Sequence, residues 1–379
     1  MTIPAPAVPE LDIEVENNLF LTEQLITYIG NKRLLGKPIL SAIDKVKKRL
    51  GKDKLRLADI FAGSGFVSRL MKQHANYLVA NDFELYSASS LRCHLSNISE
   101  VNFAELQEHV TFLNNEALQG RLVDGFIREL YAPENEENIT PNDRVFYTID
   151  NAKRIDTFAK YIAELEEPTR SLLLGPLLSS ASVHANTAGV FKGFYKNHSK
   201  GVGQFGGSNS DALKRILGRI EMQLPVLSRF ECQTEVFCEE AQSFVGVQKD
   251  FDLAYLDPPY NQHPYGSNYF MLNLICNYER PNEISRVSGI PEDWQRSTFN
   301  VRSQAAESMS SLIKSIDSHF LLVSFNDEGF ISPTEMRSIL GSFGSVSEEQ
   351  IPYTVYRGSR NLGNRSKSVT EHLFLVERS

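Results

Sequence analysis

Short apolar runs alternate with helical stretches along most of this chain. The runs have the length and apolar content of buried strands, and they lie at residues 55–61, 77–82, 231–237, 251–256, 320–325 and 371–376. Residues 66–74, between the first two runs, have helical character, as expected for a crossover between parallel strands. The pattern therefore predicts an α/β fold built on a largely parallel sheet.

The interval from 120 to 230 is too long to be a simple connection inside one compact domain. Two stretches within it, 155–167 and 211–222, have a helical pattern. We therefore expect an inserted, largely helical lobe at 120–230. The core domain that carries it would consist of residues 19–119 and 231–379.

The tetrapeptide Asp257-Pro258-Pro259-Tyr260 directly follows the run at 251–256. Two prolines cannot continue a sheet ladder, so the chain is rigid at the carboxyl end of a strand, where open α/β sheets bind ligands. The Asp257 carboxylate and a prolyl carbonyl can each accept one N–H of an amino group, and Tyr260 offers a flat face to a ring. These groups suit an exocyclic amine on a heterocycle, although the tetrapeptide by itself is also explained by a proline turn.

A glycine-containing loop, Phe61-Ala62-Gly63-Ser64-Gly65, ends the first apolar run. Its glycines let the backbone turn tightly and approach a ligand, and the next helix directs its first N–H groups to the same place. Asp82 ends the following run, at about the 20-residue interval at which such sheets place a carboxylate on ribose hydroxyls. Taken alone, Asp82 could instead cap a helix or a turn. The loop lacks the Gly-x-Gly-x-x-Gly spacing that would favour a nicotinamide enzyme.

A third motif, Tyr28-Ile29-Gly30-Asn31-Lys32, lies upstream and is by itself only a Gly-Asn turn with a surface lysine. Together, and in this order, the three motifs resemble the Dam-like, alpha-order class of adenine-specific DNA methyltransferases. The resemblance covers roughly residues 20–125 and 230–379. It implies a Rossmann-like, S-adenosylmethionine-dependent methyltransferase sheet, and it makes the inserted lobe a target-recognition domain for double-stranded DNA.

The resemblance also implies roles for the matched residues. The S-adenosylmethionine site would be formed by Tyr28, Lys32, Phe61, Gly63, Gly65, Asp82 and Asp257. Of these, Asp82 would hold the ribose hydroxyls and the glycines would pass beneath the methionine part. An acid after the third strand would lie near the adenine of the cofactor. Glu240 is the candidate, Glu239 is the alternative, and the family usually has Asp there.

The catalytic roles follow from the same resemblance. Asp257 would accept an N–H of the target amine, a prolyl carbonyl of Pro258-Pro259 would accept the other, and Tyr260 would stack on the flipped adenine. Flipping is required because the target nitrogen is out of reach inside a duplex. A cytosine-specific enzyme would more often carry Ser at this position, and an enzyme acting on glutamine would carry Asn. An RNA substrate and a non-catalytic DNA-binding protein on the same fold remain as alternatives.

The net charge of −8 is unusual for a DNA-binding protein, so local basic stretches have to supply the phosphate contacts. One glycine-rich stretch, 184–210, has no acid and contains Lys192, Lys196 and Lys200. Another, 353–367, would form a hairpin tip near the site and contains the cations Arg357, Arg360, Arg365 and Lys367. Either stretch could also be a solvated basic loop.

The remaining features exclude several classes of protein. Four cysteines show no Cys-x-x-Cys pair and no His partner at zinc spacing, so we expect reduced thiols, no metal site and a cytoplasmic protein. No run is long enough to span a membrane, and prolines at 4, 6 and 9 predict a flexible arm at 1–18 rather than a signal peptide. We expect a monomer, and a cognate restriction endonuclease as a separate partner. The recognised DNA sequence cannot be read from the chain.

Overall fold

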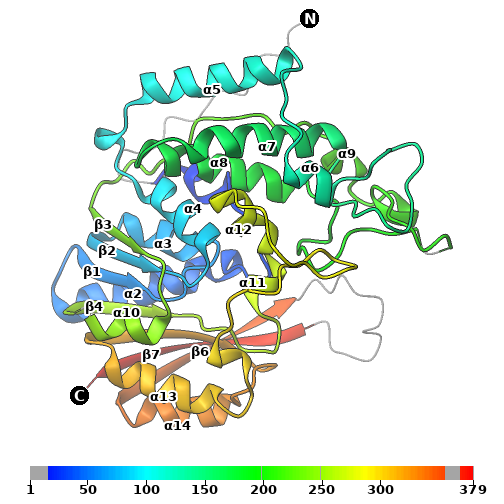
Figure 1. The fold of residues 1–379 in the computed structure, drawn as a ribbon. Coiled ribbons are helices and arrows are strands. Elements are labelled where there is room, and N and C mark those ends of the chain that lie inside the picture. The colour runs from blue at the N-terminus through cyan, green and yellow to red at the C-terminus, as the bar shows by residue number, and fades with distance from the viewer. Residues whose placement is uncertain (1–15, 198, 248, 355–367, 379) are drawn as a thin grey trace, which may run out of the picture.

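The computed structural model describes residues 16–354 and 368–378, apart from residues 198 and 248 (Figure 1). Within these residues, strands form one sheet in the order β3-β2-β1-β4-β5-β7-β6. The strands are β1 Leu55–Asp59, β2 Ala75–Asn81, β3 Gln233–Phe237, β4 Phe251–Leu256, β5 Ser318–Asn326, β6 Gly344–Thr354 and β7 Ser368–Arg378. The strands β1 to β5 pair in parallel, whereas β7 is antiparallel to both β5 and β6. The α/β prediction with a largely parallel sheet is confirmed.

Helices cover both faces of this sheet. One face packs against α2 Gly36–Leu50, α3 Phe66–Lys72 and α4 Leu85–Leu95. The other packs against α10 Ala241–Val247, α13 Ala305–Ser315 and α14 Pro333–Gly341. Every residue of β4 is buried, as expected for a central parallel strand covered on both faces.

A further helical layer lies beyond α4, at the top of the view in Figure 1. It consists of α5 Phe103–Leu118, α6 Phe126–Tyr131, α7 Ile149–Ala163, α8 Thr169–Val183 and α12 Phe270–Asn277. One cluster of buried apolar side chains joins these helices to α4. Gly175 of α8 packs so closely on α4 that a Cβ there would lie 2.5 Å from the Cys93 sulfur. The helices of residues 120–230 therefore share a core with α4 and α12.

The other helices of the described residues are short. They are α1 Asn18–Thr22, α9 Leu213–Ile216, α11 Tyr265–Asn268, and 3₁₀ turns at Arg33–Leu35, Ile98–Glu100, Gly207–Asn209 and Thr298–Asn300. In the part of the chain that the structure describes, no helix is long and apolar enough to cross a membrane. Of the arm expected at 1–18, residues 1–15 lie outside the described residues. The Glu16 carboxylate accepts hydrogen bonds from the Ser228 hydroxyl and the Arg229 N–H.

The two helices expected in the interval 120–230 have different outcomes. The first begins earlier and ends earlier than expected, as α7, because the Thr148 hydroxyl accepts the Asn151 N–H and starts the helix there. The second was wrong, since only α9 is helical between 211 and 222. Ala212 has a left-handed φ of 54° before α9, and the Asn151 side chain binds the backbone of Gly218 and Ile220 after it.

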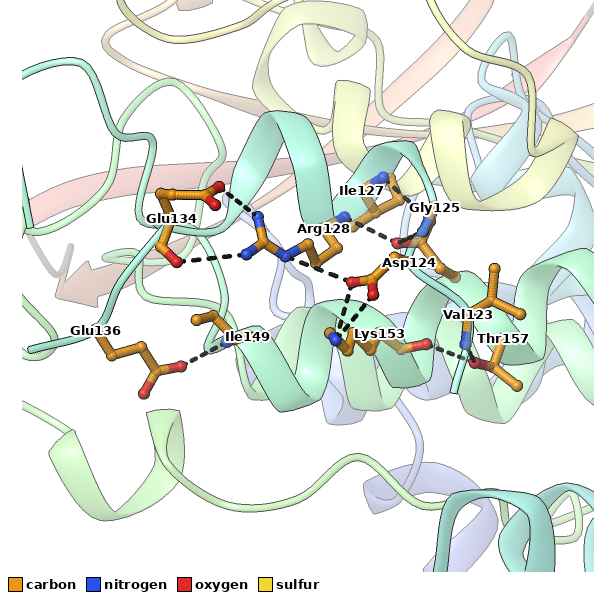
Figure 2. A network of polar contacts seen from close by, with 11 residues as sticks. Val123, Asp124, Gly125, Ile127, Arg128, Glu134, Glu136, Ile149, Lys153 and Thr157 are labelled. Carbon is orange, nitrogen blue, oxygen red and sulfur yellow. Dashed lines mark hydrogen bonds and ion pairs between the residues drawn. The ribbon is translucent and has the colours of Figure 1, made fainter. Parts of the chain in front are cut away.

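A buried carboxylate on α7 connects three parts of this layer. Asp156 accepts backbone N–H bonds from Gly125 (3.2 Å), Ile127 (3.1 Å) and Arg128 (2.8 Å) at the start of α6. It also accepts the Tyr278 hydroxyl, just after α12, at 3.0 Å. Figure 2 shows the surrounding polar contacts, including those of Arg128 at the surface. Asp156 therefore fixes α6 to α7 and to the chain that leaves α12.

We predict that Asp156→Ala lowers the free energy of unfolding by about 2–4 kcal/mol, because it leaves several buried donors without an acceptor. Urea denaturation measures this change. Asp124→Ala is the matched control, since Asp124 belongs to the same network but is largely exposed and pairs with Lys153 and Arg128 at the surface. The control should cost less than about 1 kcal/mol. Equal losses in both variants would contradict the prediction.

Candidate active site

The carboxyl ends of β1, β2 and β4 open into one cleft, as the geometry of a parallel sheet requires. The cleft holds about 860 Å³, including its solvent-open part. It is lined by parts of all three sequence motifs, by residues 81–84 at the end of β2 and by residues 239–241 after β3. Gln295, Ser297 and Asn300, from the segment before α13, form part of its rim. Motifs far apart in sequence therefore meet at one site.

The glycine loop between β1 and α3 is tightly constrained. Gly63 and Gly65 have left-handed φ angles of 53° and 76°. The Gly63 N–H donates to Asp82 Oδ2 (2.7 Å), and its carbonyl accepts the Ser87 hydroxyl (2.6 Å). A Cβ on Gly63 would lie 3.0 Å from the Tyr28 ring. The loop therefore requires glycine at this position, because any side chain would collide with the ring.

Asp82 and Glu84 place two carboxyl groups at the end of β2. Asp82 is 8% exposed, and its other oxygen accepts the Glu84 N–H at 2.9 Å. Burial raises the pKa of Asp82, although the backbone hydrogen bonds oppose the shift. Glu84 accepts the Asn273 amide at 2.7 Å, and burial raises its pKa to about 7. Sequence reasoning missed Glu84, whose proximity to Asp82 was its only signal.

Three tyrosine rings stack beside the glycine loop. Tyr28 lies 5.0 Å from Tyr265 and 4.9 Å from Tyr269 between ring centroids, with nearly parallel planes. The Ile29 N–H donates to the Tyr269 hydroxyl at 2.7 Å. The stack therefore fixes the amino-terminal motif against α11 and α12, which follow the Asp-Pro-Pro-Tyr motif. Tyr265 lines the cleft and was missed, because nothing in its local sequence distinguishes it.

Lys32 forms a buried ion pair with Asp257. Its ammonium lies 2.9 Å from Asp257 Oδ2 and 3.9 Å from Glu371 Oε1, and it donates to the Gly30 carbonyl at 3.1 Å. Burial raises the pKa of Asp257 to about 6; Glu371 adds to this shift and Lys32 opposes it. Burial disfavours the charged lysine, but the two carboxylates outweigh burial and raise the pKa of Lys32. The amino-terminal motif thus directly contacts the Asp-Pro-Pro-Tyr motif.

The rest of the tetrapeptide differs in its exposure to the cleft. Pro259 lines the cleft, whereas Pro258 and Tyr260 do not. Gly65 of the glycine loop does not line it either. The Tyr260 ring meets the Phe325 ring edge-on, at 6.1 Å, and its carbonyl accepts the Phe330 N–H. Among the hydrogen bonds of the described residues, none engages the carbonyls of the two prolines.

Two acids follow β3, as expected, and both line the cleft. Glu240 accepts the N–H groups of Gln242 (2.8 Å) and Ser243 (3.2 Å), so it caps α10. Glu239 is exposed, and its backbone is held on both sides by the Asn81 amide. The structure thus brings both candidates to the cleft, and Glu240 also caps α10.

Asp59, at the end of β1, is a further cleft residue that sequence reasoning missed. It is fully buried, and its Oδ2 accepts the Ser68 hydroxyl at 2.6 Å. Its Oδ1 has no partner within the described residues. Burial raises the pKa of Asp59 to about 7, and the nearby carboxylates of Asp257 and Asp82 add to the shift. Asn326 and Asp327, at the end of β5, accept N–H bonds from Glu328 and Thr370, and neither lines the cleft.

Lys192, Lys196 and Lys200, which were predicted to contact DNA, do not line the cleft. Lys192 and Lys200 are exposed, and the Lys196 ammonium lies 5.2 Å from the Phe194 ring centroid. The residue before Lys192 contacts α11, which carries the cleft residue Tyr265, since the Phe191 N–H donates to the Asn268 carbonyl at 2.7 Å. The other predicted cations, Arg357, Arg360, Arg365 and Lys367, lie outside the described residues.

Comparison with known proteins agrees with this geometry. The type II methyltransferase M.CviAII of Paramecium bursaria Chlorella virus 1 is 29% identical over 360 residues, which are 93% of this chain and 98% of that protein. The type II methyltransferase M.NlaIII of Neisseria lactamica is 29% identical over 366 residues, covering 93% and 100%. The modification methylase StsI of Streptococcus sanguinis is 28% identical, and its match covers 93% of this chain but 52% of that protein.

The sequence model of one family, the D12 class N6 adenine-specific DNA methyltransferases, matches residues 28–339. This range contains all three motifs that line the cleft. Because the match covers most of the chain, the protein belongs to the D12 class of N6 adenine-specific DNA methyltransferases, which use S-adenosylmethionine as the methyl donor.

Proposed function

We propose that the cleft binds S-adenosylmethionine along the glycine loop and receives a flipped adenine at Asp257 and the prolyl carbonyls. The observation that carries this proposal is the arrangement at the end of β4. There the Asp257 carboxylate and two prolyl carbonyls without hydrogen-bond partners in the described chain adjoin the cleft that the glycine loop lines. One site can thus hold both a methyl donor and an amine.

The residues of the cleft suit a cationic ligand with a nucleoside part. Gly63 and Tyr28 both line the cleft, and the lack of a Cβ on Gly63 lets the loop backbone lie close against the Tyr28 ring. The cleft is rich in carboxylates, and Asp59 Oδ1 is a buried acceptor without a partner in the described residues. We assign Asp82 to the ribose hydroxyls, and Glu240 or Glu239 to the adenine end of the cofactor.

The difficult part of the reaction is the nucleophile. S-adenosylmethionine, when bound, supplies an activated methyl group on its sulfonium. Asp257 and a prolyl carbonyl accept the two N–H bonds of the adenine amine and favour the positive charge that develops on its nitrogen during attack. Asp257 must be ionised for this role, and its pKa of about 6 leaves it so at neutral pH. The proton leaves the nitrogen once that nitrogen is cationic.

Base flipping costs a few kcal/mol, and stacking on an aromatic ring recovers about 1–3 kcal/mol. We assign the stacking to Tyr260. Its ring makes a T-shaped contact with Phe325, and the residue directly follows Pro259, which lines the cleft.

We assign residues 120–230 to recognition of the DNA sequence and residues 19–119 and 231–379 to catalysis. Support comes from the short segment before Lys192. Gly189 approaches Thr27, next to the amino-terminal motif, and Phe191 bonds to α11. A duplex held by Lys192, Lys196 and Lys200 would thus lie near the cleft. Arg357, Arg360 and Arg365 would contact the duplex from the β6–β7 connection.

The biological role that fits these relatives is modification of host DNA. Two of them are named type II methyltransferases. We infer that this enzyme protects DNA from a cognate restriction endonuclease that acts separately. It would work inside the cell as a monomer, since each transfer modifies one amine.

We predict that Asp257→Ala lowers turnover by about three orders of magnitude or more, because the amine loses its charged acceptor. The assay is transfer of a labelled methyl group from S-adenosylmethionine to unmethylated plasmid DNA, with nucleoside analysis to show label in adenine. Calorimetry should find cofactor binding within a few-fold of the wild-type value. Normal turnover in this variant would remove Asp257 from its proposed role.

We predict that Gly63→Ala weakens S-adenosylmethionine binding by about tenfold, because the new Cβ meets the Tyr28 ring and displaces it from the loop. Calorimetric titration with the cofactor measures the effect. Gly51→Ala is the matched control, since Gly51 also has a left-handed φ but a Cβ there would meet only open space. If the control variant loses as much affinity, backbone strain alone accounts for the result.

We predict that changing Lys192, Lys196 and Lys200 together to Ala weakens DNA binding and flattens its salt dependence. The slope of log K against log salt should fall by up to about 0.9 for each phosphate that a lysine no longer neutralises. The control triple is Lys54, Lys249 and Lys314, which are exposed just before β1, β4 and β5, at the opposite edge of the sheet. An unchanged slope in the first triple would place DNA elsewhere.

A further inference from the structure

The Lys32 ammonium, which pairs with Asp257, also lies near a second carboxylate, that of Glu371. Glu371 has no role in the reaction as proposed above. Glu371 lies on β7, and its Oε1 is 3.9 Å from Lys32 Nζ. It is 4% exposed, and its Oε2 has no hydrogen-bond partner among the described residues. Two buried or half-buried carboxylates therefore share one buried ammonium.

Stability does not explain Glu371. A carboxylate removed from water loses more than a 3.9 Å ion pair returns, especially when one of its oxygens is left without a donor. A neutral side chain of the same shape would fill the position at less cost. A buried acceptor without a partner calls for a functional explanation, and here the nearest charged group is Lys32.

The reaction itself gives such an explanation. Positive charge develops on the amine nitrogen while that amine is bound to Asp257. The Lys32 ammonium is bound to the same carboxylate, so its positive charge lies close to the amine nitrogen. It disfavours the positive charge that develops there, because buried charges are poorly screened. A negative charge at Glu371 offsets the charge of Lys32, and its open oxygen can accept the ammonium when the amine occupies Asp257.

We propose that Glu371 is a positioning residue for methyl transfer, which holds the Lys32 ammonium and draws it from Asp257 when the target amine binds. This inference rests on the proposed role of Asp257 as the acceptor of the amine. Glu371 touches neither substrate in this scheme and acts through Lys32.

The acid limb of the pH–rate profile, where the rate of methyl transfer falls at low pH, tests this arrangement. The ionisable groups that face Asp257 are Lys32, Glu371 on β7, Asp59 on β1, and the tyrosines 255, 260 and 265. Burial raises the pKa of all three tyrosines above its ordinary value, so their hydroxyl groups stay neutral over the pH range of the acid limb. Asp257 must be ionised to accept an N–H, and transfer is lost as pH falls through its pKa. Glu371 raises this pKa, so removing its charge should move the acid limb to lower pH.

The test is the single-turnover rate of methyl transfer to unmethylated plasmid DNA between pH 5 and 9, with saturating S-adenosylmethionine. Glu371→Gln should lower the plateau rate by about 10–100-fold and move the acid limb down by about half a pH unit or more. Glu377→Gln is the matched control on the same strand, since Glu377 pairs with Arg49 at the surface. It should keep the wild-type rate and limb.

A double substitution shows whether Glu371 acts through Lys32. If it does, Lys32→Met and the double variant Lys32→Met/Glu371→Gln should have equal rates, because the single changes are not additive. If Glu371→Gln alone fails to fold while the double variant folds, Glu371 serves only to stabilise the buried lysine, and the proposal is overturned. A double variant slower than Lys32→Met would overturn it.

Two results with Glu371→Gln would also overturn the proposal. One is a rate within twofold of wild type. The other is a lower rate with an unshifted acid limb, which would indicate a packing effect. The Asp257→Ala variant separates the two proposals, because retained turnover there removes the acceptor role itself. Lost turnover there with a normal Glu371→Gln enzyme would remove only the role of Glu371.

Discussion

Parallel pairing of β2, β1 and β4 is the constraint on which the site depends. In this register Asp59, the last residue of β1, lies beside Ala80 of β2 and Tyr255 of β4. The three strands therefore end within a few residues of one another, and the loops that follow must share one edge. The glycine loop, the residues after β2 and the Asp-Pro-Pro-Tyr motif meet for this reason, although they are far apart along the chain.

Carboxyl groups dominate this edge. Asp59, Asp82, Glu84 and Asp257 all have pKa values raised by burial, and Lys32 is the cation bound to Asp257. Such a cleft is suited to a cationic methyl donor, and it accounts for part of the acidic balance that is otherwise unusual for a DNA-modifying enzyme. It also means that the ionisation of Asp257, the proposed amine acceptor, depends on its burial, on Lys32 of the amino-terminal motif and on Glu371 of β7.

The helical layer is built into the catalytic part of the chain. It shares a buried cluster with α4 and α12, and Asp156 connects α6 and α7 to the chain after α12. The tyrosine stack then connects α11 and α12 to the amino-terminal motif beside the glycine loop. A continuous set of packed elements thus joins the region that we assign to target recognition with the cleft that we propose as the active site.

The sequence by itself determined the α/β sheet, the cofactor, and adenine in DNA as the target, and family membership confirmed each of these over the cytosine, RNA and non-catalytic alternatives. It could do so because apolar runs and short ordered motifs are local properties of the chain. Only the tertiary structure brought Asp59, Glu84, Tyr265 and Glu371 to the site, because each is an ordinary residue in its own segment and acquires its neighbours through strand pairing and helix packing. The prediction of a helix at 211–222 was wrong for the same reason: the side chain of Asn151, on the distant helix α7, binds the Gly218 carbonyl and the Ile220 N–H, which would have continued the helix.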